Sequence, residues 1–177
     1  MVPDGNVQSA NSVAREAIPH LRGLGARFPR ARFEARIVVF DDDARWQESG
    51  PVELAAWRWE PVDGQTGGLS EFGVALDLVH RHFAGENRSA DDPAPPILVA
   101  VTDGWWTDTA APSASEAIAR LDADPIAASW GRTVFPVSRE PEISGLRKFA
   151  GNGQVLDVAT PQALGSFAER FWGFDGS

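Results

Sequence analysis

The residues best placed to do chemistry lie between positions 97 and 108, in the stretch ILVAVTDGWWTD. The apolar run at its start is typical of a buried strand, so Asp103 is expected at the carboxyl end of that strand. In open α/β sheets, ligands and ions bind at that end of the strands. Asp103 is therefore a candidate ligand. The alternative is a common Asp-Gly turn that simply closes a core strand.

The same turn carries two tryptophans and a second acid. Trp105 and Trp106 are candidates for a protein-binding anchor, because exposed tryptophan concentrates interface energy. The alternative is that one tryptophan tucks into the core and the other covers it. Asp108 is expected either to cap the following segment or to contact a metal-bound water. It joins the two tryptophans as a candidate partner-binding residue.

The composition is that of an ordinary globular protein with a single domain. The chain has 177 residues, of which 43% are hydrophobic and 23% are charged. Its net charge of -9 argues against a broad nucleic-acid interface, which needs clustered Lys and Arg. The absence of cysteine excludes disulfides, thiol catalysis and Cys-ligated zinc. No apolar run approaches the roughly 20 residues of a membrane span and no signal peptide is recognisable, so we expect a cytoplasmic protein without membrane contact.

Alternating strand and helix patterns predict a three-layer α/β domain. The predicted strands cover residues 33–40, 97–101, 133–137 and 155–158, with a further short strand around 45–47 at an irregular edge. The predicted helices cover 6–24, 70–83, 143–149 and segments that begin near 113 and 160. This order predicts a doubly wound, Rossmann-like sheet that is mostly parallel, with helices on both faces. The strand at 33–40 is expected near the centre of that sheet.

Local signals mark where the helices should begin or bend. Ser70 is well placed as the N-cap of its helix. Ser113 and Glu116 have the spacing of a capping box. The pair Thr160–Pro161 is expected at the N-cap and first position of the last helix. Pro19 is expected to bend or shorten the first helix.

Three stretches carry a wider pattern: RIVVF at 36–40, GLSEFGVAL at 68–76 and VTDGWWTD at 101–108. Together they resemble the von Willebrand factor A family, and within it the bacterial tellurite-resistance (TerY-like) branch. The resemblance implies a sheet whose carboxyl edge holds a divalent cation at a metal-ion-dependent adhesion site. The family builds that site from a D-x-S-x-S loop, a Thr or Ser that opens a later helix, and the Asp of a T-D-G turn. Ser70 and Asp103 match the last two positions, so the resemblance implies that they are metal ligands.

The D-x-S-x-S loop and the strand before it are not found in this sequence. The resemblance aligns Met1 just after that loop, so we expect an N-terminally incomplete domain that lacks a central strand between those at 33–40 and 97–101. Neighbouring strands lie about 4.8 Å apart, so the omission should leave a slot about two spacings wide between unpaired edges. Because Mg²⁺ prefers about six oxygen ligands, Ser70 and Asp103 alone should bind it weakly. The alternative is that Ser70 caps its helix and Asp103 closes the turn.

These observations predict a non-enzymatic protein-binding module that acts through the carboxyl edge of its sheet. The resemblance implies a bacterial stress, conflict or signalling assembly, with a kinase, phosphatase or ATPase encoded nearby as the partner. The main alternative is a metal-dependent hydrolase or phosphotransferase of another doubly wound family, with Asp103 as a catalytic or metal-holding acid, because unrelated functions share this architecture. The lack of a nucleophile-base pair favours binding. A third alternative is a structural copy that self-associates through the open slot.

Overall fold

The structure, a computed structural model, describes residues 4–28, 32–62, 70–85, 94–107, 109–138 and 141–173. The α-helices within these ranges are α1 (Asp4–Arg27), α2 (Phe72–Ala84), α3 (Ala114–Ala123), α4 (Ile143–Ala150) and α5 (Ala163–Phe171). The strands are β1 (Glu34–Ala35), β2 (Val38–Phe40), β3 (Ala44–Trp46), β4 (Val52–Glu53), β5 (Ile97–Thr102), β6 (Gly131–Pro136) and β7 (Gln154–Val155). A short 3-10 helix, Ala127–Ser129, joins α3 to β6. No helix in these ranges combines the length and the apolarity that crossing a membrane requires.

The central sheet consists of three parallel strands in the order β5-β6-β7. β5 and β6 are paired along their whole length, from Ile97 opposite Gly131 to Thr102 opposite Pro136. Buried parallel strands carry near-continuous apolar runs, and the sequence ILVAVT of β5 is such a run.

The strands predicted for this sheet are confirmed at two of three positions. The predictions at 97–101 and 133–137 correspond to β5 and β6. The prediction at 155–158 is too long, because β7 ends at Val155. The chain then turns, with the backbone N–H of Thr160 donating to the carbonyl oxygen of Asp157 (3.0 Å).

The segment predicted as one central strand at 33–40 is two short strands, so that prediction is wrong. β1 pairs antiparallel with β4, and the hairpin that lies between them in sequence pairs β2 antiparallel with β3, in two separate two-stranded sheets. The pairing with β3 ends at Ile37. Its carbonyl still accepts from the N–H of Gln47 (3.0 Å), but its N–H donates to the Glu48 side chain (3.3 Å). The sequence does not mark this break, because both halves carry strand-like residues.

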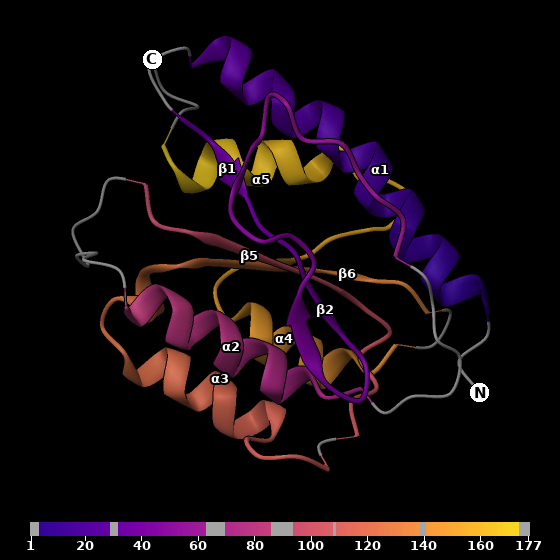
Figure 1. Ribbon diagram of the computed structural model, residues 1–177, viewed down its shortest axis with the longest axis vertical. Coiled ribbons are helices and arrows are strands. Elements are labelled where there is room, and N and C mark those ends of the chain that lie inside the picture. Colours follow the sequence, from indigo (N-terminus) through magenta and orange to yellow (C-terminus); the bar gives the residue numbers. More distant parts are fainter. Residues whose placement is uncertain are drawn as a thin grey trace.

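Helices lie on both sides of the central sheet (Figure 1). α1 and α5 pack around Phe135 on one face, and α2, α3 and α4 pack around Val134 on the other. Both side chains are fully buried, at 0% exposure. Since successive side chains of a strand point to opposite faces, β6 supplies a central residue to each of the two cores. The fold is therefore α/β, with a three-stranded parallel sheet between helical layers.

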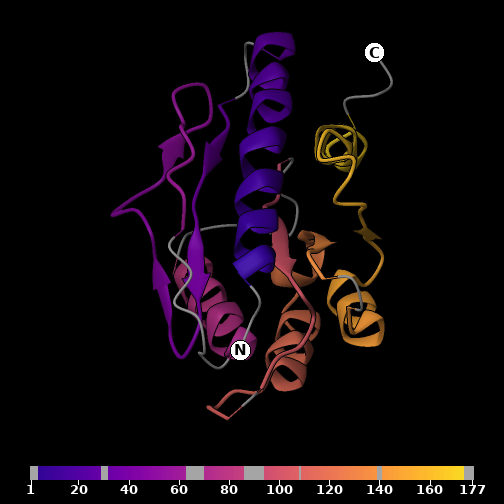
Figure 2. The same ribbon diagram turned by 90° about the vertical axis from the view of Figure 1, so that its right-hand side faces the viewer.

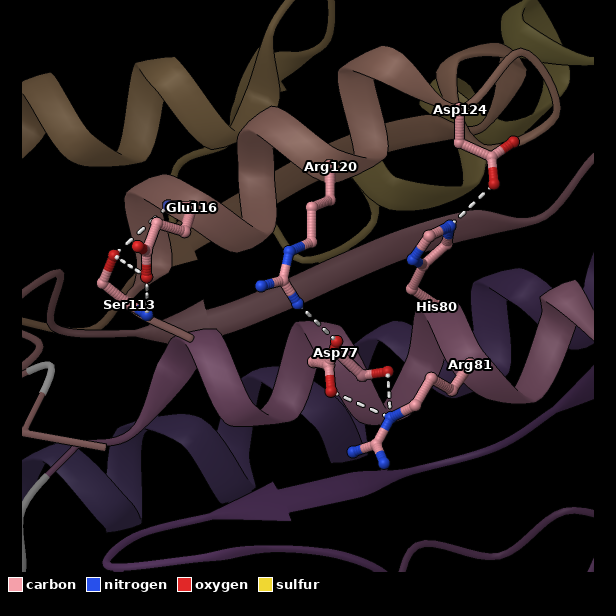
Figure 3. A network of polar contacts seen from close by, with 7 residues as sticks. All are labelled: Asp77, His80, Arg81, Ser113, Glu116, Arg120 and Asp124. Atoms are coloured by element: carbon pink, nitrogen blue, oxygen red, sulfur yellow. Dashed lines mark hydrogen bonds and ion pairs between the residues drawn. The ribbon is translucent and has the colours of Figure 1, made fainter. Parts of the chain in front are cut away.

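Polar contacts hold α2 against α3 (Figure 3). Asp77 on α2 pairs with Arg120 on α3 (3.2 Å) and with Arg81 one turn along its own helix (2.8 Å). Further along the two helices, His80 contacts Asp124 (2.7 Å), and this hydrogen bond is the main cause that lowers the pKa of Asp124. None of these five residues lines the cavity described below. They stabilise helix packing.

The capping box predicted at Ser113 and Glu116 is confirmed. The Ser113 hydroxyl accepts from the N–H of Glu116 (3.3 Å), and the Glu116 carboxylate accepts from the N–H of Ser113 (2.9 Å). The bond from the Ser113 N–H is the main cause that lowers the pKa of Glu116, and a bond that the Ser113 hydroxyl donates to the same carboxylate (3.0 Å) adds to the shift. Pro19 lies inside an α-helix that continues to Arg27, so the predicted shortening of the first helix is wrong.

The other two predicted helix starts are wrong. α2 begins at Phe72 and not after Ser70, because the backbone of Ser70 is hydrogen-bonded to Thr107 on another loop. α5 begins at Ala163, because the residues from Thr160–Pro161 onward form turns before the helix. The start of α2 is therefore decided by a contact with another loop, and that of α5 by local turns.

Gly73 is the point where α2 passes closest to the segment before α3. A Cβ atom at Gly73 would lie 2.1 Å from the carbonyl oxygen of Pro112, so we expect Gly73→Ala to lower the free energy of unfolding by about 1–3 kcal/mol. Gly23 on α1 is the matched control: a Cβ atom there meets nothing within 4 Å, and Ala is about 1 kcal/mol better than Gly in a helix. Urea unfolding followed by tryptophan fluorescence measures both, and equal stability of the two variants would contradict the close packing.

Candidate functional site

A cavity of about 1030 Å³ lies between β2 and β5. The edges of these two strands form its long sides, and apolar residues of α1 and α2 form its other walls. Figure 2 shows the hairpin strands on one side of α1 and β5 on the other. The cavity therefore lies between the two segments, 33–40 and 97–101, for which the sequence predicted an open slot.

One end of the cavity lies at the carboxyl ends of β2 and β5, where Asp41, Ser70 and Asp103 line it. Backbone hydrogen bonds join the three segments. The N–H of Glu71 donates to the carbonyl oxygen of Asp41 (3.0 Å), and the N–H of Thr107 donates to that of Ser70 (3.2 Å). The structure thus brings the predicted site residues Ser70 and Asp103 to the rim of one cavity.

The turn after β5 is fixed by its own hydrogen bonds. The Thr102 hydroxyl accepts from the N–H of Gly104 (3.2 Å), and Oδ1 of Asp103 accepts from the N–H of Trp105 (3.1 Å). Gly104 has a φ of 83°, in the left-handed region that favours glycine, and a Cβ atom there would lie 3.0 Å from the carbonyl oxygen of Glu142. Asp103 therefore closes the turn, as the structural alternative predicts, and lines the cavity as well.

The two tryptophans of this turn have different environments. Trp105 is 60% exposed. Trp106 stacks on Phe72, with ring centroids 4.6 Å apart, and packs against the core formed with α2, α3 and α4. Gly145 leaves room for it, since a Cβ atom there would lie 2.8 Å from Cζ2 of Trp106. Trp106 is therefore a packing residue, and Trp105 is the remaining candidate for an anchor.

Glu71, a buried carboxylate, holds the start of α2 against the loop that follows the turn. The residue is 1% exposed, and its oxygens accept from the N–H groups of Thr109 and Ala110 (both 3.1 Å) and from the Thr109 hydroxyl. The hydroxyl bond is the main cause that lowers the pKa of Glu71. Burial opposes the shift, and the two backbone bonds add to it. A single glutamate forms no recognisable sequence motif. The only feature of the sequence that could have indicated the role of Glu71 is its position next to Ser70.

The two ends of the cavity carry opposite charges. Arg36, just before β2, lines the cavity towards its amino end, where its guanidinium lies 4.4 Å from the Trp46 ring centroid and contacts His82. Asp41 and Asp103 line the opposite end. The stretch between these ends is lined mainly by apolar side chains of the strands and helices.

The carboxyl rim supplies few oxygens for a cation. Mg²⁺ prefers about six oxygen ligands in octahedral geometry. Asp103 accepts a hydrogen bond from its own turn, and Asp41 pairs with Arg45 (3.2 Å). Across the described ranges, no three His, Cys, Asp or Glu residues are grouped so that they could hold a metal ion. Asp108, the other acid predicted for this rim, lies outside the described residues.

No protein-family model, curated protein or solved structure matches this chain.

Glu71 makes the stability of the fold depend on pH. Because the folded-state pKa is lowered, the carboxylate stabilises the fold above its usual value of 4.5, and this contribution is lost as the pH falls through the folded-state value. We expect Glu71→Gln to lower the midpoint of urea unfolding at neutral pH, with a difference from the unsubstituted protein that shrinks below pH 4.5. Glu60→Gln, at an exposed position, is the control. A difference that stays constant from neutral to acid pH would contradict this role.

Mg²⁺ should bind the isolated protein weakly. A bound ligand raises the free energy of unfolding by an amount that grows with the logarithm of one plus the ligand concentration divided by Kd. A weak site therefore leaves the melting temperature almost unchanged. We expect about 1 mM Mg²⁺ to raise the melting temperature by less than about 1 °C, measured by differential scanning fluorimetry. A rise of several degrees that disappears in Asp103→Ala would show a strong cation site at the rim.

Proposed function

We propose that this chain is a non-enzymatic protein-binding module with the architecture of a doubly wound domain of the von Willebrand factor A type. The observation that carries the proposal is that Ser70 and Asp103 share the rim of one largely apolar cavity, with Trp105 exposed on the same turn. Tryptophan is enriched among the residues that dominate protein interfaces, and apolar clefts with a polar rim are typical binding sites. The partner binds at this rim.

Binding in this proposal does not require a bound Mg²⁺. Trp105 supplies apolar contact area, and Asp41 and Asp103 supply negative charge at the cavity end. The net charge of -9 adds to this field, so a partner with basic residues is favoured. The resemblance in sequence supports a kinase, phosphatase or ATPase of a bacterial stress or signalling assembly as that partner.

A random peptide library displayed on phage tests binding without knowledge of the partner. We expect peptides selected on the immobilised protein to bind Trp105→Ala at least about tenfold more weakly, because truncating an anchor typically costs about 2 kcal/mol or more. Trp105→Phe is the matched control and should keep most of the affinity, since it keeps an aromatic ring at the position. Isothermal titration calorimetry with the selected peptides measures both variants. Equal affinity for Trp105→Ala, or no enriched peptide at all, would refute the proposal.

A further inference from the structure

β2 and β5 present strand edges to each other across the cavity. Among the described residues, β5 pairs with β6 alone and β2 pairs with β3 alone. The other edge of each strand lines the cavity, whose walls are mainly apolar side chains. Backbone N–H and C=O groups in such a place need hydrogen-bond partners. An edge of this kind is a template for pairing with another strand.

The two edges run in the same direction. Asp41 directly follows β2 and its carbonyl is bonded to Glu71, and the turn after β5 is bonded to Ser70 through Thr107. Because Ser70 and Glu71 are adjacent, the carboxyl ends of β2 and β5 lie at the same end of the cavity. A single strand placed between them can therefore lie parallel to both.

Helices cover both faces of the slot, as they cover the two faces of a buried strand in an α/β sheet. Side chains of α1, such as Ile18, cover one face, and side chains of α2, such as Leu76, cover the other. Val99, in the middle of β5, lines the cavity and is 37% exposed, although central positions of parallel sheets are normally covered on both faces. A strand with apolar side chains on both of its faces would cover Val99 and complete the layer.

The length of the cavity suits one strand. Six residues of a strand span about 20 Å. All six residues of β5 line the cavity, which has a volume of about 1030 Å³.

Charge at the two ends selects the direction of the occupant. At the amino end, Arg32 and Glu34 line the cavity as an ion pair (2.9 Å), so Arg36 supplies the remaining positive charge. At the carboxyl end, Asp41 is paired with Arg45, so Asp103 supplies the remaining negative charge. A strand parallel to its neighbours is therefore matched when acidic residues precede its apolar run and basic residues follow it.

We infer that the slot binds one extended segment of a partner protein by strand addition. The segment has about six consecutive apolar residues, preceded by acidic and followed by basic residues, and lies parallel to β2 and β5. Its binding gives a continuous sheet in the order β3-β2-segment-β5-β6-β7. This inference rests on the proposed function, since it states the chemistry of the partner that the same cavity binds.

A synthetic peptide with two glutamates, six alternating valines and leucines, and two lysines is the probe. We expect it to slow hydrogen exchange of the amides in β2 and β5 by about tenfold or more in the full chain. A peptide with the charged ends exchanged should bind about threefold more weakly, as exposed ion pairs of modest strength imply. A peptide with N-methylated backbone amides keeps the apolar side chains but removes the donors, and it should not protect the two strands.

Substitution tests whether the probe occupies the slot. Val99→Glu places a charge inside the slot and should weaken binding of the probe by at least about tenfold, because burying an unpaired charge is strongly unfavourable. Ala55→Glu adds the same charge at an exposed position that does not line the cavity, so this control should bind the probe as the unsubstituted protein does. The partial exposure of Val99 favours folding of the variant, and the N-methylated peptide tests the inference even if the variant does not fold.

Several outcomes would overturn the inference. No protection of β2 and β5 by the probe, or equal binding of the N-methylated peptide, would exclude strand addition. Tighter binding of the peptide with exchanged ends would overturn the assigned direction. A peptide-free dimer with β2 and β5 already protected, detected by sedimentation and hydrogen exchange, would assign the slot to a second copy of the chain. If library peptides depend on Trp105 while the exchange of β2 and β5 is unchanged, the proposed function stands and strand addition is refuted.

Discussion

The separation of β2 from β5 determines how the rest of the molecule is held together. Because no described residue of β2 pairs with the central sheet, side chains and helices must hold the hairpins in place. On one face, Phe40 packs against Phe72 of α2 with ring centroids 5.4 Å apart. On the other, Asn11 of α1 accepts from the Trp59 indole (3.0 Å) and donates to the carbonyl oxygen of Val62 (3.0 Å). The two helices therefore set the width of the slot.

The carboxyl rim depends in turn on a short segment in front of α2. Ser70 and Glu71 bond to the end of β2 and to the loop after β5, so they connect the two sides of the slot. The Glu71 carboxylate strengthens this connection, because it is ionised, buried and bonded to the Thr109 and Ala110 loop. Buried charges are tolerated when hydrogen bonds replace the lost water. The rim is thus a fixed structure before any partner binds.

The sequence predicts those features that are decided by residues close together in the chain. The apolar run of β5 and the capping box at Ser113 and Glu116 are of this kind, and both are present. The start of α2 is of another kind, because Glu71 is held by Thr109, which is 38 positions away. Likewise, the end of the pairing at Ile37 coincides with a bond from its N–H to the side chain of Glu48, 11 positions away. Such tertiary contacts override local propensity and leave no pattern in the chain.

The two adjacent tryptophans of the candidate site are a second example of residues whose environment is decided by tertiary contacts. The sequence cannot tell Trp105 from Trp106, but Gly104 turns the chain with a positive φ and Gly145 makes room for a ring. Trp106 consequently packs, partly buried, against Phe72 and the core, and Trp105 is exposed beside it. A site whose walls and rim are already packed loses little conformational entropy when a ligand binds. The combination of a fixed rim and unpaired strand edges therefore favours binding of an extended chain over closure of the slot, because closure would require α1 and α2 to repack.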